Sequence, residues 1–239
     1  MAFGLHRDLA TRFERIELGL ATMGGVVEAQ LADAVSAFER RDVALADDVV
    51  GRDRKTDAHE RAVEQSVIDL LESRRLAPDA LRRAMGAVKI AAEMERVGDL
   101  AKNVAHRTRR MAEEDAAGAL RGASQPVARM GRAAHAQLSA ALDALFRSDP
   151  VAARAVRDGD DRVDDLYNSV FGELVTVMGR RPTLAPVAVH LIFAAKNIER
   201  VGDHATNIAE RVHYAITGRE LTEDRVKTDA TSMLSLVAE

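Results

Sequence analysis

The chain has 239 residues, of which 47% are apolar but only 3% aromatic, and its formal net charge is −4. It contains no cysteine, which excludes disulfides, thiolate zinc sites and cysteine nucleophiles, and its mild acidity argues against general nucleic-acid binding. The longest uncharged run near the N-terminus, residues 18–27, is neither a signal peptide nor a membrane span. We therefore expect a cytoplasmic protein built from Ala-, Leu- and Val-rich helices, without insertion into the membrane.

Apolar residues recur at three- and four-residue spacing along almost the whole chain, which is typical of amphipathic helices rather than of strands. The predicted helices span roughly 5–40, 43–75, 79–115, 124–147, 151–179 and 184–217. The breaks between them carry turn residues, such as Pro78 with Asp79 and the stretch from Gly118 to Pro126. Residues 219–239 have a weaker pattern and are expected to form a mobile tail, in which 233–237 is able to dock as a short helix.

The chain contains an internal repeat. The pentapeptide Glu-Arg-Val-Gly-Asp occurs at 95–99 and again at 199–203, 104 positions later, and upstream positions match at an offset of 107. The matched polar residues include Asn103 with Asn207, Asp53 with Asp160, and Asp57 with Asp164. The sequence therefore predicts an all-α fold of two tandem, pseudo-symmetric three-helix bundles, over 1–117 and 118–218, followed by a tail over 219–239.

The repeated polar residues lie on a helix face that core packing does not dictate. On a helical wheel the apolar residues of 194–212 form one stripe, and Glu199, Asp203 and Asn207 lie opposite it. If consecutive helices pack antiparallel, each aspartate pair lies near the Glu/Asp pair of the next helix, so four carboxylates and an amide oxygen meet on one surface of each half. The candidate metal ligands are Asp53, Asp57, Glu95, Asp99 and Asn103 in the first half, and Asp160, Asp164, Glu199, Asp203 and Asn207 in the second.

A bound cation explains such a surface better than chance does. Like charges one helical turn apart destabilise a helix by a few tenths of a kcal/mol per pair, and clustered carboxylates otherwise repel one another or take up protons. Oxygen ligands favour hard ions such as Mg²⁺, Ca²⁺ or Mn²⁺, iron is also compatible with them, and bridging carboxylates can hold more than one ion. The strongest alternative is a metal-free helical adaptor whose acidic faces bind basic partner surfaces.

Gly98 and Gly202 lie between the core stripe and the acidic face of their helices. Glycine inside a helix costs about 1 kcal/mol relative to alanine, so its presence indicates close approach of another helix or of a ligand, and a helix crossing is the favoured interpretation. Arg96 and Arg200 flank the acidic face from the other edge, either paired with the carboxylates or as ordinary surface arginines.

Two kinds of metalloenzyme fit the sequence less well. A ferritin-like di-iron oxidase needs Glu-x-x-His twice, and only Glu210 with His213 matches this spacing. A metal-dependent hydrolase needs a base beside the metal, but the counterparts of His59 and His106 in the second half are Leu166 and Glu210. A duplicated site that does not duplicate its base argues against catalysis, and we expect no enzymatic activity.

At these residues the sequence resembles the PhoU family, the phosphate-transport accessory and regulatory proteins of bacteria. The resemblance rests on the two Glu-x-x-x-Asp motifs, Glu95 with Asp99 and Glu199 with Asp203, each followed by Asn, and on the Asp-x-x-x-Asp pairs that precede them. It covers nearly the whole chain, about 1–218. A single motif of this kind is uninformative, but two in register within equal halves are specific.

The resemblance implies two three-helix bundles with multinuclear metal clusters held by the motif carboxylates. The metal is expected to be iron, manganese, magnesium, calcium or zinc. The resemblance further implies a cytoplasmic, non-enzymatic negative regulator of phosphate uptake, and we expect it to form a homodimer. Its implied partners are the ATPase of the phosphate ABC transporter and the phosphate-sensing histidine kinase of a two-component system.

Overall fold

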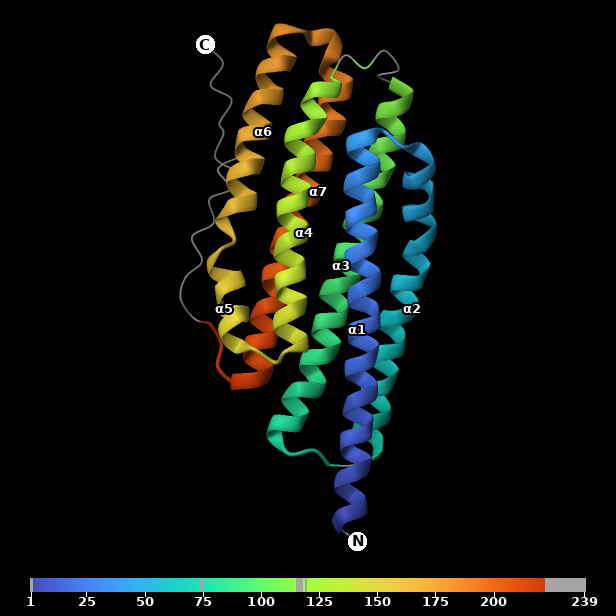
Figure 1. Cartoon of the computed structure of the whole chain (residues 1–239), viewed down its shortest axis with the longest axis vertical. Helices are drawn as coiled ribbons and strands as arrows, with labels where there is room; N and C mark the ends of the chain where they lie inside the picture. Colours follow the sequence, from blue (N-terminus) through green and yellow to red (C-terminus); the bar gives the residue numbers. More distant parts are fainter. Residues whose placement is uncertain (1, 74, 115–117, 119, 222–239) are drawn as a thin grey trace.

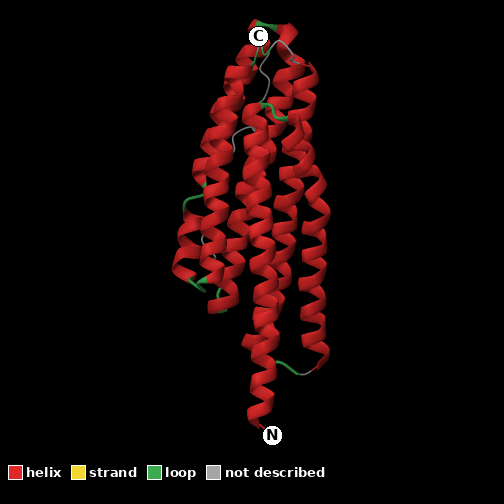
Figure 2. Cartoon of the chain, turned by 45° about the vertical axis from the view of Figure 1, so that its right-hand side comes forward, coloured by secondary structure: helices red, strands yellow, loops and turns green. Residues whose placement is uncertain are grey.

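The structure is a computed structural model that describes residues 2–73, 75–114, 118 and 120–221. Every regular element in these residues is helical (Figure 2). The α-helices are α1 (Ala2–Arg40), α2 (Val43–Ser73), α3 (Pro78–Glu114), α4 (Ser124–Phe146), α5 (Pro150–Asp158), α6 (Asp161–Arg180) and α7 (Ala185–Thr217). Short 3-10 turns, Arg121–Ala123 and Pro182–Leu184, precede α4 and α7. The expected tail helix at 233–237 lies outside the described residues.

The helices form two bundles that lie side by side along one long axis (Figure 1). Helices α1, α2 and α3 make the first bundle, and α4, α5, α6 and α7 make the second. The central helices α3 and α7 form the most extensive interhelical contact, and α1 also packs against α4. Each of α3 and α7 is therefore covered by its own bundle on one side and by the other bundle on another.

The turn that opens the second helix of each bundle is duplicated in atomic detail. Asp42 Oδ1 accepts a hydrogen bond from the Leu45 N–H at 3.0 Å, and Asp149 Oδ1 accepts one from the Ala152 N–H at 3.0 Å. The residue before each aspartate has a positive φ, 57° at Arg41 and 50° at Ser148. These aspartates cap α2 and α5, which explains why both copies of the turn keep Asp at this place.

The second bundle departs from the prediction at one point. The expected continuous helix over 151–179 is divided, because α5 ends at Asp158 and α6 begins at Asp161. At the break, the Gly159 N–H donates both to the Ala155 carbonyl at 3.2 Å, an α-helical bond, and to the Val156 carbonyl at 3.3 Å, the tighter bond of a 3-10 turn, so the last turn of α5 tightens as the helix ends. The side chain of the next residue, Asp160, turns inward to hydrogen-bond Gln137 and Thr206, which fixes the interruption there.

Close helix crossings explain the two motif glycines. A Cβ on Gly98 would lie 3.0 Å from Cγ2 of Thr56 on α2, and a Cβ on Gly202 would lie 3.2 Å from Oε1 of Gln137 on α4. Both glycines therefore permit neighbouring helices to approach, as the sequence favoured. Within the described residues, no helix has both the length and the apolar character that are needed to cross a bilayer.

Candidate functional site

The first carboxylate cluster, which we define as Asp53, Asp57, Glu95 and Asp99, forms between α2 and α3. The ammonium nitrogen of Lys102 joins the two helices, since its Nζ atom lies 2.6 Å from Oδ2 of Asp53 and 2.6 Å from Oδ1 of Asp99. Antiparallel packing thus brings the aspartate of one helix to the motif of the next, as expected. It does so around a lysine whose part in the cluster the sequence interpretation missed.

Glu95 lies in the same electrostatic environment. Its pKa is raised, first because burial disfavours the charged form and then because Asp99, Glu60 and Asp57 are negatively charged, against the opposing attraction of Arg96. The Arg96 guanidinium lies 3.5 Å from Oε2 of Glu95 and 3.6 Å from Oδ2 of Asp99. This arginine is largely exposed and pairs with the cluster from its solvent side.

The second carboxylate cluster comprises Asp160, Asp164, Glu199 and Asp203. Three of its members are buried, with 7% of Asp160, 6% of Asp164 and 4% of Glu199 exposed, so the prediction of a face away from the core is wrong for them. The reason is tertiary. Glu199 lies opposite the apolar stripe of α7 but is still covered, because α7 packs against α3, α4, α5 and α6, and Asp160 is buried where it meets Gln137 on α4 and Thr206 on α7. Asp203 is half-buried.

Two hydrogen bonds from other helices hold Asp160. Its Oδ1 accepts from Nε2 of Gln137 at 2.7 Å and from the hydroxyl of Thr206 at 2.7 Å. In the same cluster, Lys196 Nζ lies 2.8 Å from Oε1 of Glu199 and 5.0 Å from the centre of the Tyr167 ring. A lysine thus contacts a motif carboxylate in each cluster, Lys102 at Asp99 and Lys196 at Glu199.

The two motif asparagines, Asn103 and Asn207, lie in different surroundings from each other. Asn207 Nδ2 donates to Oε2 of Glu93 at 3.2 Å, across the interface between the bundles. Nδ1 of His204 lies 2.7 Å from the same oxygen. Burial by itself raises the pKa of Glu93, but the hydrogen bonds from His204 and Asn207 outweigh burial and hold the pKa below its ordinary value. Asn103 is exposed and lines a polar groove with His106 and several arginines.

A pair of glutamines was also missed. Gln30 on α1 accepts from the Thr56 hydroxyl at 3.0 Å and donates to the Gly98 carbonyl at 3.3 Å, and Gln137 occupies the corresponding place in the second bundle. The signal was available, since Gln30 and Gln137 are separated by the same 107 positions as the matched aspartates. Both glutamines sit under the motif glycine of their bundle, beside the carboxylates.

The donor chemistry of the first cluster fits a hard cation. One ammonium nitrogen contacts carboxylates from two helices, so the point that it occupies is reached by oxygen ligands of both. Within the part of the chain that the structure describes, however, no three acidic or histidine side chains converge closely enough to ligate one ion. Instead, Asp53 and Asp99 are paired with Lys102.

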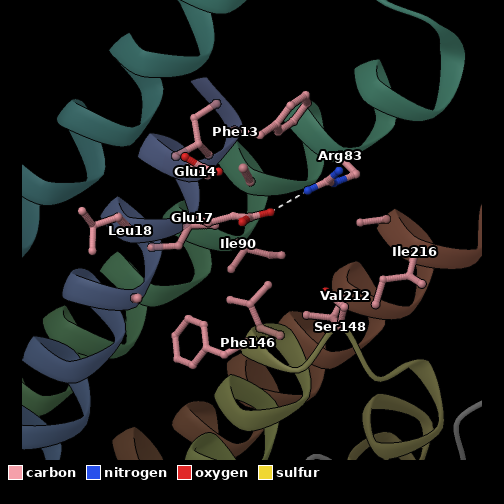
Figure 3. Close-up of a pocket in the computed structure, with 16 residues that line it drawn as sticks. Phe13, Glu14, Glu17, Leu18, Arg83, Ile90, Phe146, Ser148, Val212 and Ile216 are labelled. Atoms are coloured by element: carbon pink, nitrogen blue, oxygen red, sulfur yellow. Dashed lines mark hydrogen bonds and ion pairs between the residues drawn. The ribbon is translucent and has the colours of Figure 1, made fainter. Parts of the chain in front are cut away.

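An apolar groove of about 450 Å³ lies apart from both clusters, between α1, α3, the end of α4 and the end of α7 (Figure 3). Its apolar wall includes Leu18, Phe146 and Ile216, which are exposed, and its rim carries the ion pair between Glu17 and Arg83 at 2.5 Å. None of the predicted ligands lines this groove. It is a feature of the junction between the bundles rather than of the duplicated motif.

Comparison with known proteins agrees with this organisation. The PhoU domain profile matches residues 20–108 and 127–212. A phosphate-specific transport system accessory protein PhoU homolog of Caulobacter vibrioides is 41% identical over 210 residues, covering 88% of this chain and 90% of that protein. The homolog of Rhizobium meliloti is 39% identical over 220 residues, covering 92% of each.

Solved structures lead to the same conclusion. PhoU from Pseudomonas aeruginosa superposes with a TM-score of 0.77 at 33% identity, covering 88% of this chain and 99% of that one. The phosphate transport system regulatory protein PhoU from Streptococcus pneumoniae shares the fold, with a TM-score of 0.80 at 20% identity over 89% of this chain and 99% of that one. The predicted fold class and the predicted resemblance are confirmed, and the chain belongs to the PhoU family.

Proposed function

We propose that the chain is a cytoplasmic accessory and regulatory protein of phosphate-specific transport, which restrains phosphate uptake and phosphate-starvation signalling. The observation that carries this is the 41% identity to a phosphate transport accessory protein, which extends over 88% of this chain and 90% of that protein. Since the family consists of accessory and regulatory proteins, the chain is not an enzyme. Regulation then takes place through protein–protein contacts.

The partners we propose are the ATPase of the phosphate ABC transporter and the phosphate-sensing histidine kinase, and we propose that the protein acts as a homodimer. We further propose that the chain divides into bundles over 1–117 and 118–218 with a tail over 219–239. Support for the division comes from the duplicated turn at Asp42 and Asp149 and from the two matches to the PhoU domain.

Metal binding by the two clusters is part of the same proposal. Asp53, Asp57, Glu95 and Asp99 would hold ions in the first bundle, and Asp160, Asp164, Glu199 and Asp203 in the second. A bound ion would supply positive charge that offsets the mutual repulsion of these carboxylates. The raised pKa of Glu95, which burial and its acidic neighbours cause, supports a cluster short of positive charge. Asn103 and Asn207 remain proposed ligands, with less support because Asn207 is engaged with Glu93.

The regulatory role is tested by deleting the protein in its host and following a phosphate-starvation reporter in high phosphate. We expect the deletion to release the reporter from repression and the wild-type gene to restore repression. Repression that persists in the deletion strain contradicts the regulatory role. Co-purification of the tagged protein with the transporter ATPase and with the kinase, from membranes of the same host, tests the partners separately.

Metal binding is tested by elemental analysis of protein purified anaerobically without chelators. We expect stoichiometric metal in the wild type and its loss in Asp99→Ala/Asp203→Ala. The matched control is Asp69→Ala/Asp143→Ala, which removes two exposed aspartates of other helix faces and should keep the metal. Equal metal content in all three proteins contradicts ligation by the clusters.

A metal-free adaptor is the second candidate. The observation that favours it is the ion pairing of Lys102 with Asp53 and Asp99 and of Lys196 with Glu199, which partly neutralises each cluster without metal. In that case the elemental analysis finds no metal in wild type or variants, while the reporter and co-purification results are unchanged.

A further inference from the structure

The polar groove on the C-terminal part of α3 has a volume of about 520 Å³ and a basic lining. Its walls are the side chains of Asn103, His106, Arg107, Arg109, Arg110 and Glu113. All of these except the glutamate carry N–H groups that can donate hydrogen bonds. At the offset of 104 the second bundle has Glu210 in place of His106 and Tyr214 in place of Arg110, so this set of donors is not duplicated.

Contacts with the second bundle hold the Arg107 guanidinium in place. Its Cζ atom lies 4.6 Å from the centre of the Phe193 ring, and its Nη1 atom lies 3.3 Å from Nδ1 of His190. A guanidinium only donates, so this ring nitrogen accepts, and the Nε2–H of His190 faces Oε2 of Glu114 at 3.1 Å. The guanidinium is thus oriented by an aromatic ring and a neutral imidazole, which leaves most of its five N–H donors for another acceptor.

Each of the other two arginines is held by one carboxylate. Nε of Arg109 lies 3.1 Å from Oδ1 of Asp47 on α2, and Nη1 of Arg110 lies 3.3 Å from Oε2 of Glu113. Both arginines are exposed, and a single contact leaves further N–H groups of each guanidinium open to an acceptor. The helix macrodipole does not account for them, because its effect falls off within the last turn and α3 continues to Glu114.

The ring of His106 lies in a positive potential. Burial of part of the ring lowers its pKa first, and the charges of Arg109, Lys102 and Arg107 lower it further. The charge of Asp53 opposes them less strongly. Within the described ranges the His106 side chain makes no hydrogen bond or ion pair with another residue. The groove therefore offers an anion both positive charge and hydrogen-bond donors.

We propose that this groove binds a tetrahedral oxyanion of the phosphate class, either free phosphate or the phosphate group of a small molecule. Planar guanidinium groups pair with phosphate through two N–H donors, and three arginines with an imidazole can supply donors to several of its oxygens at once. A carboxylate has only two oxygens, in one plane, and would leave part of this donor set unused. Binding of this kind needs no metal, so it stands apart from the metal sites and from the regulatory role proposed above.

Arginine footprinting of the wild-type full chain tests the groove without any variant. The protein is treated with phenylglyoxal, which modifies accessible guanidinium groups, in sodium chloride or in inorganic phosphate of the same ionic strength, and each arginine is quantified by mass spectrometry. We expect phosphate to reduce labelling of Arg107, Arg109 and Arg110 several-fold. Labelling of the exposed Arg54 and Arg61 on α2 should stay constant.

A parallel arm with methyl phosphate, a phosphate monoester, distinguishes the two sources of the ligand. Protection by both compounds fits a site for free phosphate, and protection by the monoester alone assigns the site to a phosphorylated small molecule. If neither compound protects the three arginines of the groove, the proposal is overturned. It is also overturned if the arginines on α2 are protected to the same degree, since the effect is then general attraction of anions.

Substitution gives a second measurement, by titration calorimetry with inorganic phosphate and with methyl phosphate. Arg109→Gln/Arg110→Gln should weaken binding by about tenfold or more, because charge-assisted hydrogen bonds to the anion are lost. The matched control is Arg54→Gln/Arg61→Gln, which removes the same charge from α2 and should bind as the wild type does. Thermal unfolding without anion checks that both variants are folded. Equal affinities in the two variants would remove the site, whatever the reporter and metal experiments show.

Discussion

Oε2 of Glu93 on α3 lies 2.7 Å from Nδ1 of His204 on α7, so a polar contact joins the two bundles at their most extensive interface. A carboxylate only accepts, so the ring nitrogen donates, and the Asn207 amide donates to the same oxygen at 3.2 Å. The contact is partly buried, which makes loss of either partner costly.

We predict that Glu93→Gln lowers the free energy of unfolding at neutral pH by about 1 to 3 kcal/mol, since the negative charge that strengthens the hydrogen bonds from His204 and Asn207 is lost. His204 and Asn207 hold the pKa of Glu93 below its ordinary value of 4.5, against the opposing effect of burial. The wild type therefore has this stabilisation above about pH 4.5 and loses it as the pH falls through the folded-state pKa. Denaturant unfolding between pH 3 and 7 measures it, and the two proteins should converge at the acidic end.

The ionisation of Glu95 should change the stability of the fold with pH in the opposite direction. Burial and the neighbouring acids raise its pKa, so the folded state binds this proton more tightly than the unfolded chain, and stability is lost as the pH rises from about 4.5 through the folded-state pKa. We predict that Glu95→Gln stabilises the chelator-treated protein at pH 7 by a few tenths of a kcal/mol and has no effect at pH 3.5. A destabilised variant at pH 7 would show that Arg96 outweighs the repulsion.

Gly131 marks the crossing of α4 with α1. A Cβ there would lie 2.6 Å from Cγ2 and 2.9 Å from Cγ1 of Val35, a branched and rotationally stiff side chain. We predict that Gly131→Ala destabilises the protein, because overpacking of about 1 to 3 kcal/mol exceeds the gain in helix propensity of about 1 kcal/mol. Gly25→Ala, where nothing lies within 4 Å, should be stabilising instead. Thermal unfolding compares the two, and Gly131→Ala/Val35→Ala should recover part of the loss.

The glutamine pair offers a test within the repeat. Gln137 donates to the buried carboxylate of Asp160, whereas Gln30 donates to a backbone carbonyl. We predict that Gln137→Leu costs about 1 to 3 kcal/mol, since a buried charged acceptor loses a donor, and that Gln30→Leu costs less. Urea unfolding of both variants checks this order. Equal losses would indicate that the packing volume of the side chain decides, not its hydrogen bond.

The sequence by itself determined the local and periodic features of this protein. Helical spacing of apolar residues located the helices, and the fixed offsets revealed the duplication. Such features depend on neighbours within a turn or two of helix, which a single chain segment already contains. The interruption at Gly159 was not among them, because it depends on Asp160 reaching Gln137 and Thr206 on other helices.

Only the tertiary structure decided which groups surround the duplicated carboxylates. A helical wheel locates the face of Glu199 but does not show that other helices cover that face. The wheel therefore places Glu199 on the outside of the bundle, whereas only 4% of the residue is exposed. The position of a side chain four bonds long, such as Lys102 between Asp53 and Asp99, depends on the register of two packed helices. Identical pentapeptides thus differ in burial, with Glu95 half-buried and Glu199 buried, since burial depends on the neighbouring helices and not on the local sequence.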